Sequence, residues 1–348
     1  MSDPVIGPPW HRPLRGTLDR RVIESAALCG NRLGDPTVRP LYVYSPPGAR
    51  AQDAPLPVIY LIQGFTGQVD MWHNRSWHRP TVIELIDELF SDASVPPCRV
   101  AMVDCWTSLG GSQFVDSPAI GDYHTYLCED AVAFVDANYA TLADSAHRAI
   151  TGKSSGGYGA MITPMLRPDL FGAMASHAGD ALFELCYWKD VPEVVRALRD
   201  RYEGSYERYL AERLTRPMMS DTADAALLNM WAMAAAYSAD QDGTVTLPFD
   251  VSTGRQLPAV WERWLAWDPV RMVDRHADAL RSLRGIYLDA GTRDEFFLDL
   301  GAVAFRDALA GVGVTDVRFE LFAAGHGGIE YRYPLALRYL AERIAAAG

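Results

Sequence analysis

The chain has 348 residues, of which 49% are hydrophobic and 22% are charged, and these fractions are ordinary for a folded globular protein. Its formal net charge of −12 argues against nucleic acid or an anionic membrane surface as a partner, because both require a positive face. Five scattered cysteines without a C-x-x-C pair favour reduced, mostly buried thiols over a disulfide framework. The first residues contain no apolar signal core and no run reaches membrane-spanning length, so we expect a cytoplasmic protein.

The first half of the chain alternates predicted strands with predicted helices. Residues 1–20 contain four prolines and little periodicity, which predicts an irregular arm. A continuous apolar run such as Pro57–Ile62 suits a strand that is buried on both faces of a parallel sheet. Strands that alternate with helices at this spacing predict a parallel sheet covered on both faces. The predicted strands are Arg21–Ser25, Val38–Ser45, Pro57–Ile62, Arg99–Val103, Arg148–Thr151 and Ala173–Ser176, and the helices are Thr81–Phe90 and Glu129–Tyr139.

Residues Gly152–Gly156 read G-x-S-x-G and lie between a predicted strand and a helix-compatible segment. A sharp strand-to-helix turn exposes a serine oxygen and aims it at a base, with helix amides nearby. Glycines lie two residues either side of Ser154, as a crowded turn requires. Ser155 is the rival, but Lys153 would then occupy the crowded position. We therefore take Ser154 as the nucleophile; the alternative is a glycine-rich turn with an incidental serine.

The segment Asp70–His78 contains two histidines and an acid, which raises the possibility of a metal site. Its histidines, His73 and His78, are not at the i, i+4 spacing of a helical metal pair, and no second cluster supports them. We therefore expect neither a metal nor a cofactor, and interpret the segment as a solvated loop or an aromatic rim.

The segments Pro57–Gly67, Gly111–Tyr123 and Gly152–Ala160, followed by Arg167–Gly172, resemble in order the putative-esterase branch of the α/β-hydrolases. That branch includes esterase D-like, enterochelin-esterase-like and mycolyltransferase-like proteins. The resemblance covers nearly the whole chain except roughly residues 181–270. It implies an α/β-hydrolase fold, with a mostly parallel central sheet and helices on both faces.

Two features depart from the pattern of this family. Lys153 and Ser155 stand where many relatives carry a His or Tyr and a Met around the nucleophile. The thioester-hydrolysing relatives often have a cysteine in the loop after the third strand, and Phe65–Gly67 has none. The second difference weakens an assignment to glutathione thioesters.

From about residue 181 to residue 270 the pattern becomes helical and aromatic instead of alternating. We interpret this segment as a cap inserted into a core of residues 1–180 and 271–348. Trp231, Trp261 and Trp264 are candidates to line an apolar substrate pocket, since a cap that buries a substrate needs apolar walls. The alternative is that each tryptophan only packs the cap. Gln63 and Trp106, on two core loops, are further substrate-binding candidates.

The core pattern resumes with a helix Val273–Leu283, strands Gly285–Asp289 and Val317–Phe322, and a final helix Tyr333–Ala346. The family fold places an acid a few residues beyond the penultimate strand, which selects Asp294; Asp289 and Asp180 are the rivals. His326 follows the last strand on a glycine-rich loop, and Ser, Asp and His occur in the chain order expected of this fold.

The resemblance implies acyl transfer through a covalent intermediate. His326 would deprotonate Ser154, Asp294 would orient the imidazole, and the backbone amides of Ser155 and Phe65 would hold the oxyanion. With water as acceptor the chain is an esterase for a small or medium-sized, apolar or aromatic ester; with an alcohol it is an acyltransferase. A catalytically silent binding protein on the same fold is the hypothesis from a different class. The oligomeric state is not predicted.

Overall fold

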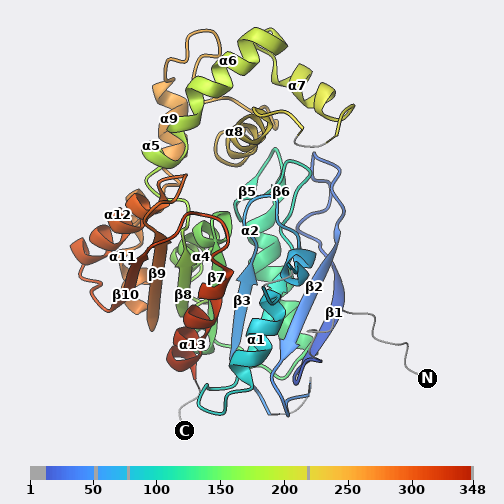
Figure 1. The fold of residues 1–348 in the computed structure, drawn as a ribbon, viewed down its shortest axis with the longest axis vertical. Helices are drawn as coiled ribbons and strands as arrows, with labels where there is room; N and C mark the ends of the chain where they lie inside the picture. The colour runs from blue at the N-terminus through green and yellow to red at the C-terminus, as the bar shows by residue number, and fades with distance from the viewer. Residues whose placement is uncertain (1–12, 51–53, 77–78, 218–219, 346–348) are drawn as a thin grey trace.

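The computed structural model describes residues 13–50, 54–76, 79–217 and 220–345, and an eight-stranded sheet forms its centre (Figure 1). β1 and β2 run antiparallel to their neighbours, and all other pairings in the sheet are parallel. The strands, in order across the sheet, are β1 (Thr17–Glu24), β2 (Val38–Ser45), β4 (Arg99–Val103), β3 (Val58–Ile62), β7 (Arg148–Lys153), β8 (Ala173–His177), β9 (Gly285–Gly291) and β10 (Val317–Phe322).

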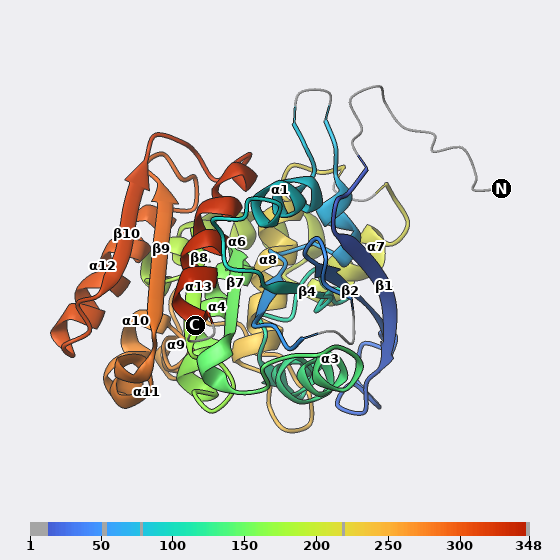
Figure 2. The same ribbon diagram turned by 90° about the horizontal axis from the view of Figure 1, so that it is seen from below.

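Helices cover both faces of this sheet, so alternate side chains of the central strands enter two separate cores (Figure 2). In β3, Ile59 and Leu61 pack on the face of α1 and α13, whereas Tyr60 and Ile62 pack on the face of α4. This explains why the sequence of β3 is a continuous apolar run. All five cysteines are unpaired, and four of them are buried, as predicted for reduced thiols.

Thirteen α-helices are assigned among the described residues. Helix α1 begins with a capping box, in which the Thr81 hydroxyl accepts from the Glu84 amide and the Glu84 carboxylate accepts from the Thr81 amide. The helices of the core are α1 (Val82–Phe90), α2 (Tyr123–Thr125), α3 (Val132–Asn138), α4 (Ser155–Leu166), α11 (Ala277–Ser282), α12 (Leu298–Gly311) and α13 (Tyr333–Ile344). Those of the segment 181–272 are α5 (Phe183–Cys186), α6 (Val191–Tyr202), α7 (Tyr206–Arg213), α8 (Asp224–Tyr237), α9 (Pro258–Leu265) and α10 (Pro269–Met272).

Short elements connect these helices and strands. A π-helix at Tyr126–Ala131 joins α2 to α3, and two-residue strands β5 (Asp116–Ser117) and β6 (Gly121–Asp122) pair within the segment 104–123, the core loop that contains Trp106. The remaining turns of 3-10 helix are Val69–His73, Ser145–His147, Trp188–Asp190, Asp274–His276 and Glu330–Arg332.

The amino-terminal arm differs from the prediction. Residues 1–12 lie outside the described part of the chain, but residues 17–20 belong to β1 and not to an irregular arm. β1 is an edge strand, and Asp19, Arg20 and Arg21 give it no apolar alternation. Its extended form comes from backbone pairing with β2, which a sequence pattern does not display.

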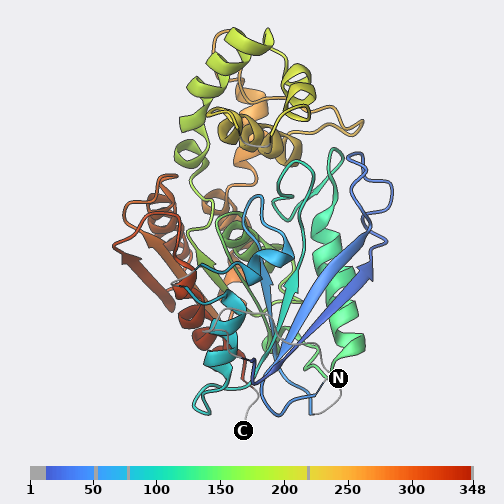
Figure 3. The same ribbon diagram turned by 45° about the vertical axis from the view of Figure 1, so that its right-hand side comes forward.

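Helices α5 to α9 lie together over the end of the sheet at which β7 meets α4 (Figures 1 and 3). The aromatic and aliphatic side chains of this segment pack onto the larger of the two cores, together with α4 and the sheet. The segment predicted as a cap is therefore helical and adjoins the G-x-S-x-G turn. The division of the chain at residues 181 and 270 into two units stays a prediction.

Candidate active site

The G-x-S-x-G turn connects β7 to α4, with Ser154 as the residue between them. Ser154 has φ 59° and ψ −127°, a conformation that side-chain-bearing residues rarely adopt. A Cβ placed on Gly152 would lie 2.5 Å from the Gly156 carbonyl carbon, and one on Gly156 would lie 2.5 Å from the Ile62 carbonyl oxygen. Only glycine fits these two positions, and their close packing holds the Ser154 hydroxyl at the end of the sheet.

The structure brings the three predicted catalytic side chains into one hydrogen-bonded chain. His326 Nε2 is 3.0 Å from Ser154 Oγ, and His326 Nδ1 is 2.8 Å from Asp294 Oδ2. Asp294 is buried and follows β9, while His326 follows β10, so adjacent parallel strands deliver both groups to the same edge. Glu295 accepts the backbone N–H of His326 at 2.8 Å and fixes its loop. With Nδ1–H donated to Asp294, the imidazole has Nε2 free to accept the serine proton.

The rival candidates have other partners. Ser155 Oγ donates to Asp180 Oδ2 at 3.3 Å, so its hydroxyl is directed at a carboxylate and not at an imidazole. Asp289 accepts hydrogen bonds from His177 Nδ1 at 2.6 Å and from Arg332 Nε at 2.9 Å. The geometry therefore distinguishes Asp294 from both rival acids.

The second aspartate–histidine pair, Asp289–His177, was missed by the sequence reasoning, which gave His177 no role. The two residues are opposite each other in the register of β8 and β9, and both are buried. Burial acts to raise the pKa of Asp289, but His177 and Arg332 outweigh it and hold that pKa below its ordinary value. The backbone carbonyl of His177 also accepts the Ser154 amide at 2.9 Å, so His177 helps to fix the backbone of the turn that carries Ser154.

Two backbone amides can complete the site. Ser155 is the first residue of α4, where N–H groups have no partner within the helix and the helix dipole favours negative charge. Phe65 lies in the turn after β3, and the adjoining Gly64 packs so closely that a Cβ there would be 3.1 Å from the Lys153 carbonyl oxygen. Ser155 and Phe65 both line the cavity beside Ser154. An oxyanion hole formed by these two amides stays a prediction.

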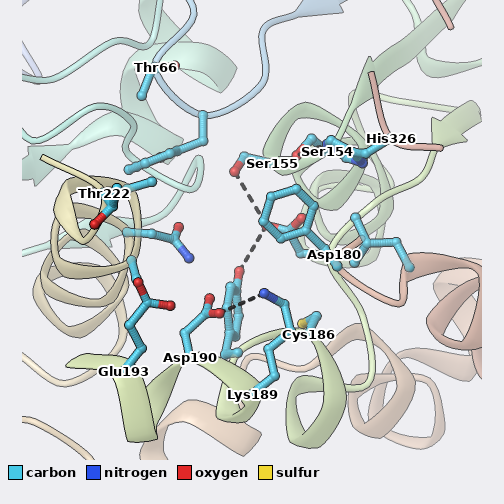
Figure 4. A pocket seen from close by; sticks show the side chains of 17 residues that line it. Thr66, Ser154, Ser155, Asp180, Cys186, Lys189, Asp190, Glu193, Thr222 and His326 are labelled. Carbon is cyan, nitrogen blue, oxygen red and sulfur yellow. Dashed lines mark hydrogen bonds and ion pairs between the residues drawn. The ribbon is translucent and has the colours of Figure 1, made fainter. Parts of the chain in front are cut away.

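A cavity of about 440 Å³ lies beside Ser154 and His326 and is lined by residues of the core, of α5, α6 and α8, and of the segments that adjoin these helices (Figure 4). Apolar and polar side chains both line it. Its less polar lining residues are Phe65, Cys186, Ala225, Ala226, Phe296 and Leu298, and its polar groups besides Ser154, Ser155 and His326 are Thr66, Asp180, Tyr187, Lys189, Asp190, Glu193, Thr222 and Asn229. Asp180 had been considered only as a rival acid. No periodicity of the sequence singled out the others.

The two core residues predicted to bind substrate do not line this cavity, which corrects that prediction. Gln63 is buried, and its side-chain amide bridges the Val103 carbonyl, at 2.9 Å, and the amides of Cys105 and Trp106, at 2.9 and 3.0 Å. Its role is to join the ends of β3 and β4. The carbonyl of Trp106 accepts hydrogen bonds from Arg39 and Tyr123, so this segment is also held within the core.

The three cap tryptophans do not line the cavity either, and the packing alternative describes them better. Trp231 stacks on Tyr206 with 4.7 Å between ring centroids, beside a different and shallow groove. Trp264 is fully buried and its Nε1–H donates to Ser238 Oγ at 2.9 Å; Trp261 packs against it. Large aromatic surfaces gain more from complete burial between helices than from exposure at a cavity wall. The apolar part of the cavity wall is instead formed by phenylalanines, leucine and alanines.

The segment that raised the metal alternative is only partly described, because His78 lies outside the described residues. Asp70 accepts the Tyr42 hydroxyl at 2.5 Å, and His73 Nε2 is 3.3 Å from an Arg20 guanidinium nitrogen. Burial and then the Arg20 charge lower the pKa of His73. In the described ranges no three His, Cys, Asp or Glu side chains gather as a metal site would require.

The family described as putative esterase matches residues 35–334 of this chain. Among solved structures, a ferulic acid esterase aligns with a TM-score of 0.60 at 17% identity, covering 95% of this chain and 100% of that one. An S-formylglutathione hydrolase from Agrobacterium tumefaciens aligns at 0.56 and 17% identity, covering 96% and 98%. MPT51 of Mycobacterium tuberculosis aligns at 0.54 and 15%, covering 94% and 98%. These likenesses identify the α/β-hydrolase fold. Within the described ranges, no helix has both the length and the apolar character to cross a membrane.

Proposed function

The chain belongs to the putative esterase family of the α/β-hydrolases, and on that premise we propose that it is a serine carboxylic-ester hydrolase with Ser154 as nucleophile. The observation that carries the proposal is the chain of contacts from Ser154 Oγ to His326 and from His326 to Asp294, at 3.0 and 2.8 Å. An isolated serine hydroxyl is a weak nucleophile, and a base that is itself oriented by a carboxylate is what activates it.

The reaction then proceeds in two acyl-transfer steps. His326 Nε2 takes the proton as Ser154 Oγ attacks the ester carbonyl, and Asp294 stabilises the resulting imidazolium. The amides of Ser155 and Phe65 stabilise the oxyanion of the tetrahedral intermediate. His326 returns the proton to the leaving alcohol, which departs and leaves an acyl group on Ser154. Water activated by the same imidazole releases the acid and restores the hydroxyl.

The cavity supports a small or medium-sized ester as the substrate. Its volume of about 440 Å³ suits a group of that size, and Phe65, Phe296 and Leu298 offer apolar contact near Ser154. An apolar or aromatic acyl group would gain about 25 cal/mol for each Å² removed from water against these side chains. The polar groups listed above line the same cavity, so the substrate also carries polar atoms.

A panel of chromogenic esters of graded acyl length tests the proposal, with Ser154→Ala and Ser155→Ala as a matched pair. Ser154→Ala is expected to lower kcat by a factor on the order of 10⁴ or more without unfolding the protein. Ser155→Ala is expected to lose far less, because its backbone amide is retained. A serine-directed phosphonate should label the wild type and fail to label Ser154→Ala.

If Ser155→Ala is the inactive variant, the nucleophile is wrongly assigned. If no ester is turned over and no phosphonate adduct forms, the catalytically silent binding protein becomes the better description. Product analysis with and without an added alcohol distinguishes hydrolysis from acyl transfer, since a new ester appears only if the alcohol competes with water.

A further inference from the structure

Asp180 lies in the cavity beside the nucleophile, but the acyl-transfer steps give it no task. It follows β8 and precedes α5, only 7% of its surface is exposed, and it lines the cavity together with Ser154 and His326. Figure 4 shows it next to Ser155, with Asp190 and Glu193 on the opposite side of the cavity. A carboxylate held in so little solvent is costly unless its oxygens have partners.

Among the described residues, only one of its two oxygens has hydrogen-bond partners. Oδ2 accepts from Gln113 Nε2 at 3.0 Å, Tyr187 Oη at 2.9 Å and Ser155 Oγ at 3.3 Å. Oδ1 accepts no hydrogen bond from any residue in the described ranges, yet it is not among the completely enclosed polar atoms that lack a partner. Because Asp180 lines the cavity and its Oδ1 is not completely enclosed, we take Oδ1 to face the cavity. Burial raises the pKa of Asp180 above its ordinary value, and in the ionised carboxylate Oδ1 is an acceptor.

The surrounding backbone holds Asp180 in this orientation. Ala178 and Leu182, two residues either side of it, have φ of 43° and 58°, and Gln113 and Phe114 have φ of 52° and 55°. A side-chain-bearing residue in the left-handed region is strained, and four such residues persist only where the surrounding structure enforces their conformation. The carboxylate is thus fixed before any ligand arrives, which lowers the ordering cost of binding.

We propose that Asp180 Oδ1 binds a hydrogen-bond donor on the substrate, so that the preferred ester carries a hydroxyl or a protonated amine close to the scissile bond. This inference rests on the esterase function proposed above. It names the substrate class that the apolar walls alone leave open.

The charges of the cavity favour neutral and cationic donors over anionic substrates. Among the described residues that line the cavity, Asp180, Asp190 and Glu193 carry carboxyl groups and one residue, Lys189, carries an ammonium group. Lys189 Nζ is 2.6 Å from Asp190 Oδ1, so this pair balances itself and the other two carboxylates are left in excess. An ester with a carboxylate tail would meet like charge, whereas an ammonium group would meet opposite charge.

Replacing Asp180 by Asn tests the proposal, because it changes one of the two terminal side-chain atoms from a hydrogen-bond acceptor to a donor and leaves the other an acceptor. The amide oxygen of Asn can still accept from Gln113, Tyr187 and Ser155. The amide NH₂ then takes the place of Oδ1 and presents a donor to the cavity where the wild type presents an acceptor. A purely structural role for Asp180 predicts equal losses on all substrates.

The assay compares methyl esters that differ at one position. Methyl 3-hydroxybutanoate and methyl 3-aminobutanoate carry a donor, methyl 3-methylbutanoate is the apolar counterpart, and methyl 3-oxobutanoate carries an acceptor only. The 4-hydroxymethyl, 4-aminomethyl, 4-ethyl and 4-acetyl methyl benzoates form an aromatic series with a longer reach. Hydrolysis is followed by titration of the released acid, and each kcat/KM is divided by that of the apolar counterpart.

In at least one series the wild type is expected to prefer the donor esters by about tenfold or more. The Asp180→Asn variant is expected to lose that preference and to gain relative activity on the acceptor-only ester. Asp87→Asn is the matched control: Asp87 is a buried acid on α1, outside the cavity, that accepts the amides of Arg15 and Gly16 at 3.0 and 2.8 Å, so its replacement should lower Tm but leave the ratios unchanged.

Equal ratios for wild type and Asp180→Asn in both series would overturn the inference, as would a wild type that hydrolyses all members alike. Should Asp180→Asn fail to fold, the wild-type ratios still decide, because a preference for the apolar or acceptor-only esters contradicts a donor site. Failure of the proposed function looks different: then no ester in either series is hydrolysed by the wild type.

Discussion

The single variants Asp294→Asn and Asp289→Asn should show that the two buried aspartate–histidine pairs have different roles, one in catalysis and one in stability. The residues are five positions apart and both are buried, and each contacts a histidine ring. Only His326, the partner of Asp294, reaches Ser154. We expect Asp294→Asn to abolish catalysis with a modest loss of stability, and Asp289→Asn to lower stability while the folded fraction keeps most of its activity.

The magnitudes follow from the contacts. Asn at 294 removes the negative charge that stabilises the imidazolium and selects its tautomer, a change worth a factor on the order of 10⁴ in kcat where such a triad operates. Asn at 289 leaves Arg332 and His177 facing a neutral group inside the protein, and breaking a buried ion pair costs about 3–5 kcal/mol. With roughly 2.1 cal/mol/K per residue, 348 residues give about 0.73 kcal/mol/K, so Tm should fall by about 4–7 °C.

Steady-state kinetics on a chromogenic ester and thermal unfolding by circular dichroism measure the two effects on the same samples. Activity is assayed well below the lower Tm, so that unfolding does not imitate a catalytic loss. The reasoning is refuted if Asp289→Asn is the inactive variant and Asp294→Asn retains turnover, since the carboxylate that orients His326 would then be misassigned. Loss of activity in both variants, with unchanged Tm, would contradict the separation.

Four further outcomes are expected. Trp264→Ala should lower stability by about 3–5 kcal/mol in denaturant unfolding, with little change in the relative rates on bulky and small esters, because its ring is fully buried and reaches the cavity only indirectly, by packing against Tyr187. Gly156→Ala should reduce kcat and Tm together, because its methyl group would lie 2.5 Å from the Ile62 carbonyl oxygen. The pKa of Asp289 is lowered on folding, so its stabilising contribution is complete above its unfolded value of about 3.9 and is lost as pH falls further; acid unfolding should therefore be less steep in Asp289→Asn than in the wild type. A chelator should leave ester turnover unchanged in rate assays, and a loss restored by a divalent ion would contradict the metal-free mechanism.

Much of this architecture could be predicted because each signal was local. The continuous apolar run of β3 indicates a strand buried on both faces, and therefore a parallel sheet. The glycines around Ser154 indicate a crowded turn, and therefore the turn that carries the serine. The positions of Asp294 and His326 followed from chain order within a recognised fold. In these cases the residue and its immediate neighbours contain the physical reason for its position.

The tertiary structure decided which side chains face one another. A tryptophan on an amphipathic helix reads the same whether it faces a cavity or another helix, and for Trp231, Trp261 and Trp264 the packing of α5 to α9 decided against the cavity. Likewise the sequence does not distinguish the roles of Asp180 and Asp289, because each is an aspartate at or after the end of a predicted strand. Only the register of β8 with β9 paired Asp289 with His177, and only the packing of the segment after β8 placed Asp180 in the wall of the cavity beside the nucleophile. Sequence patterns report burial and periodicity, whereas the direction of a polar side chain depends on partners that lie far away along the chain.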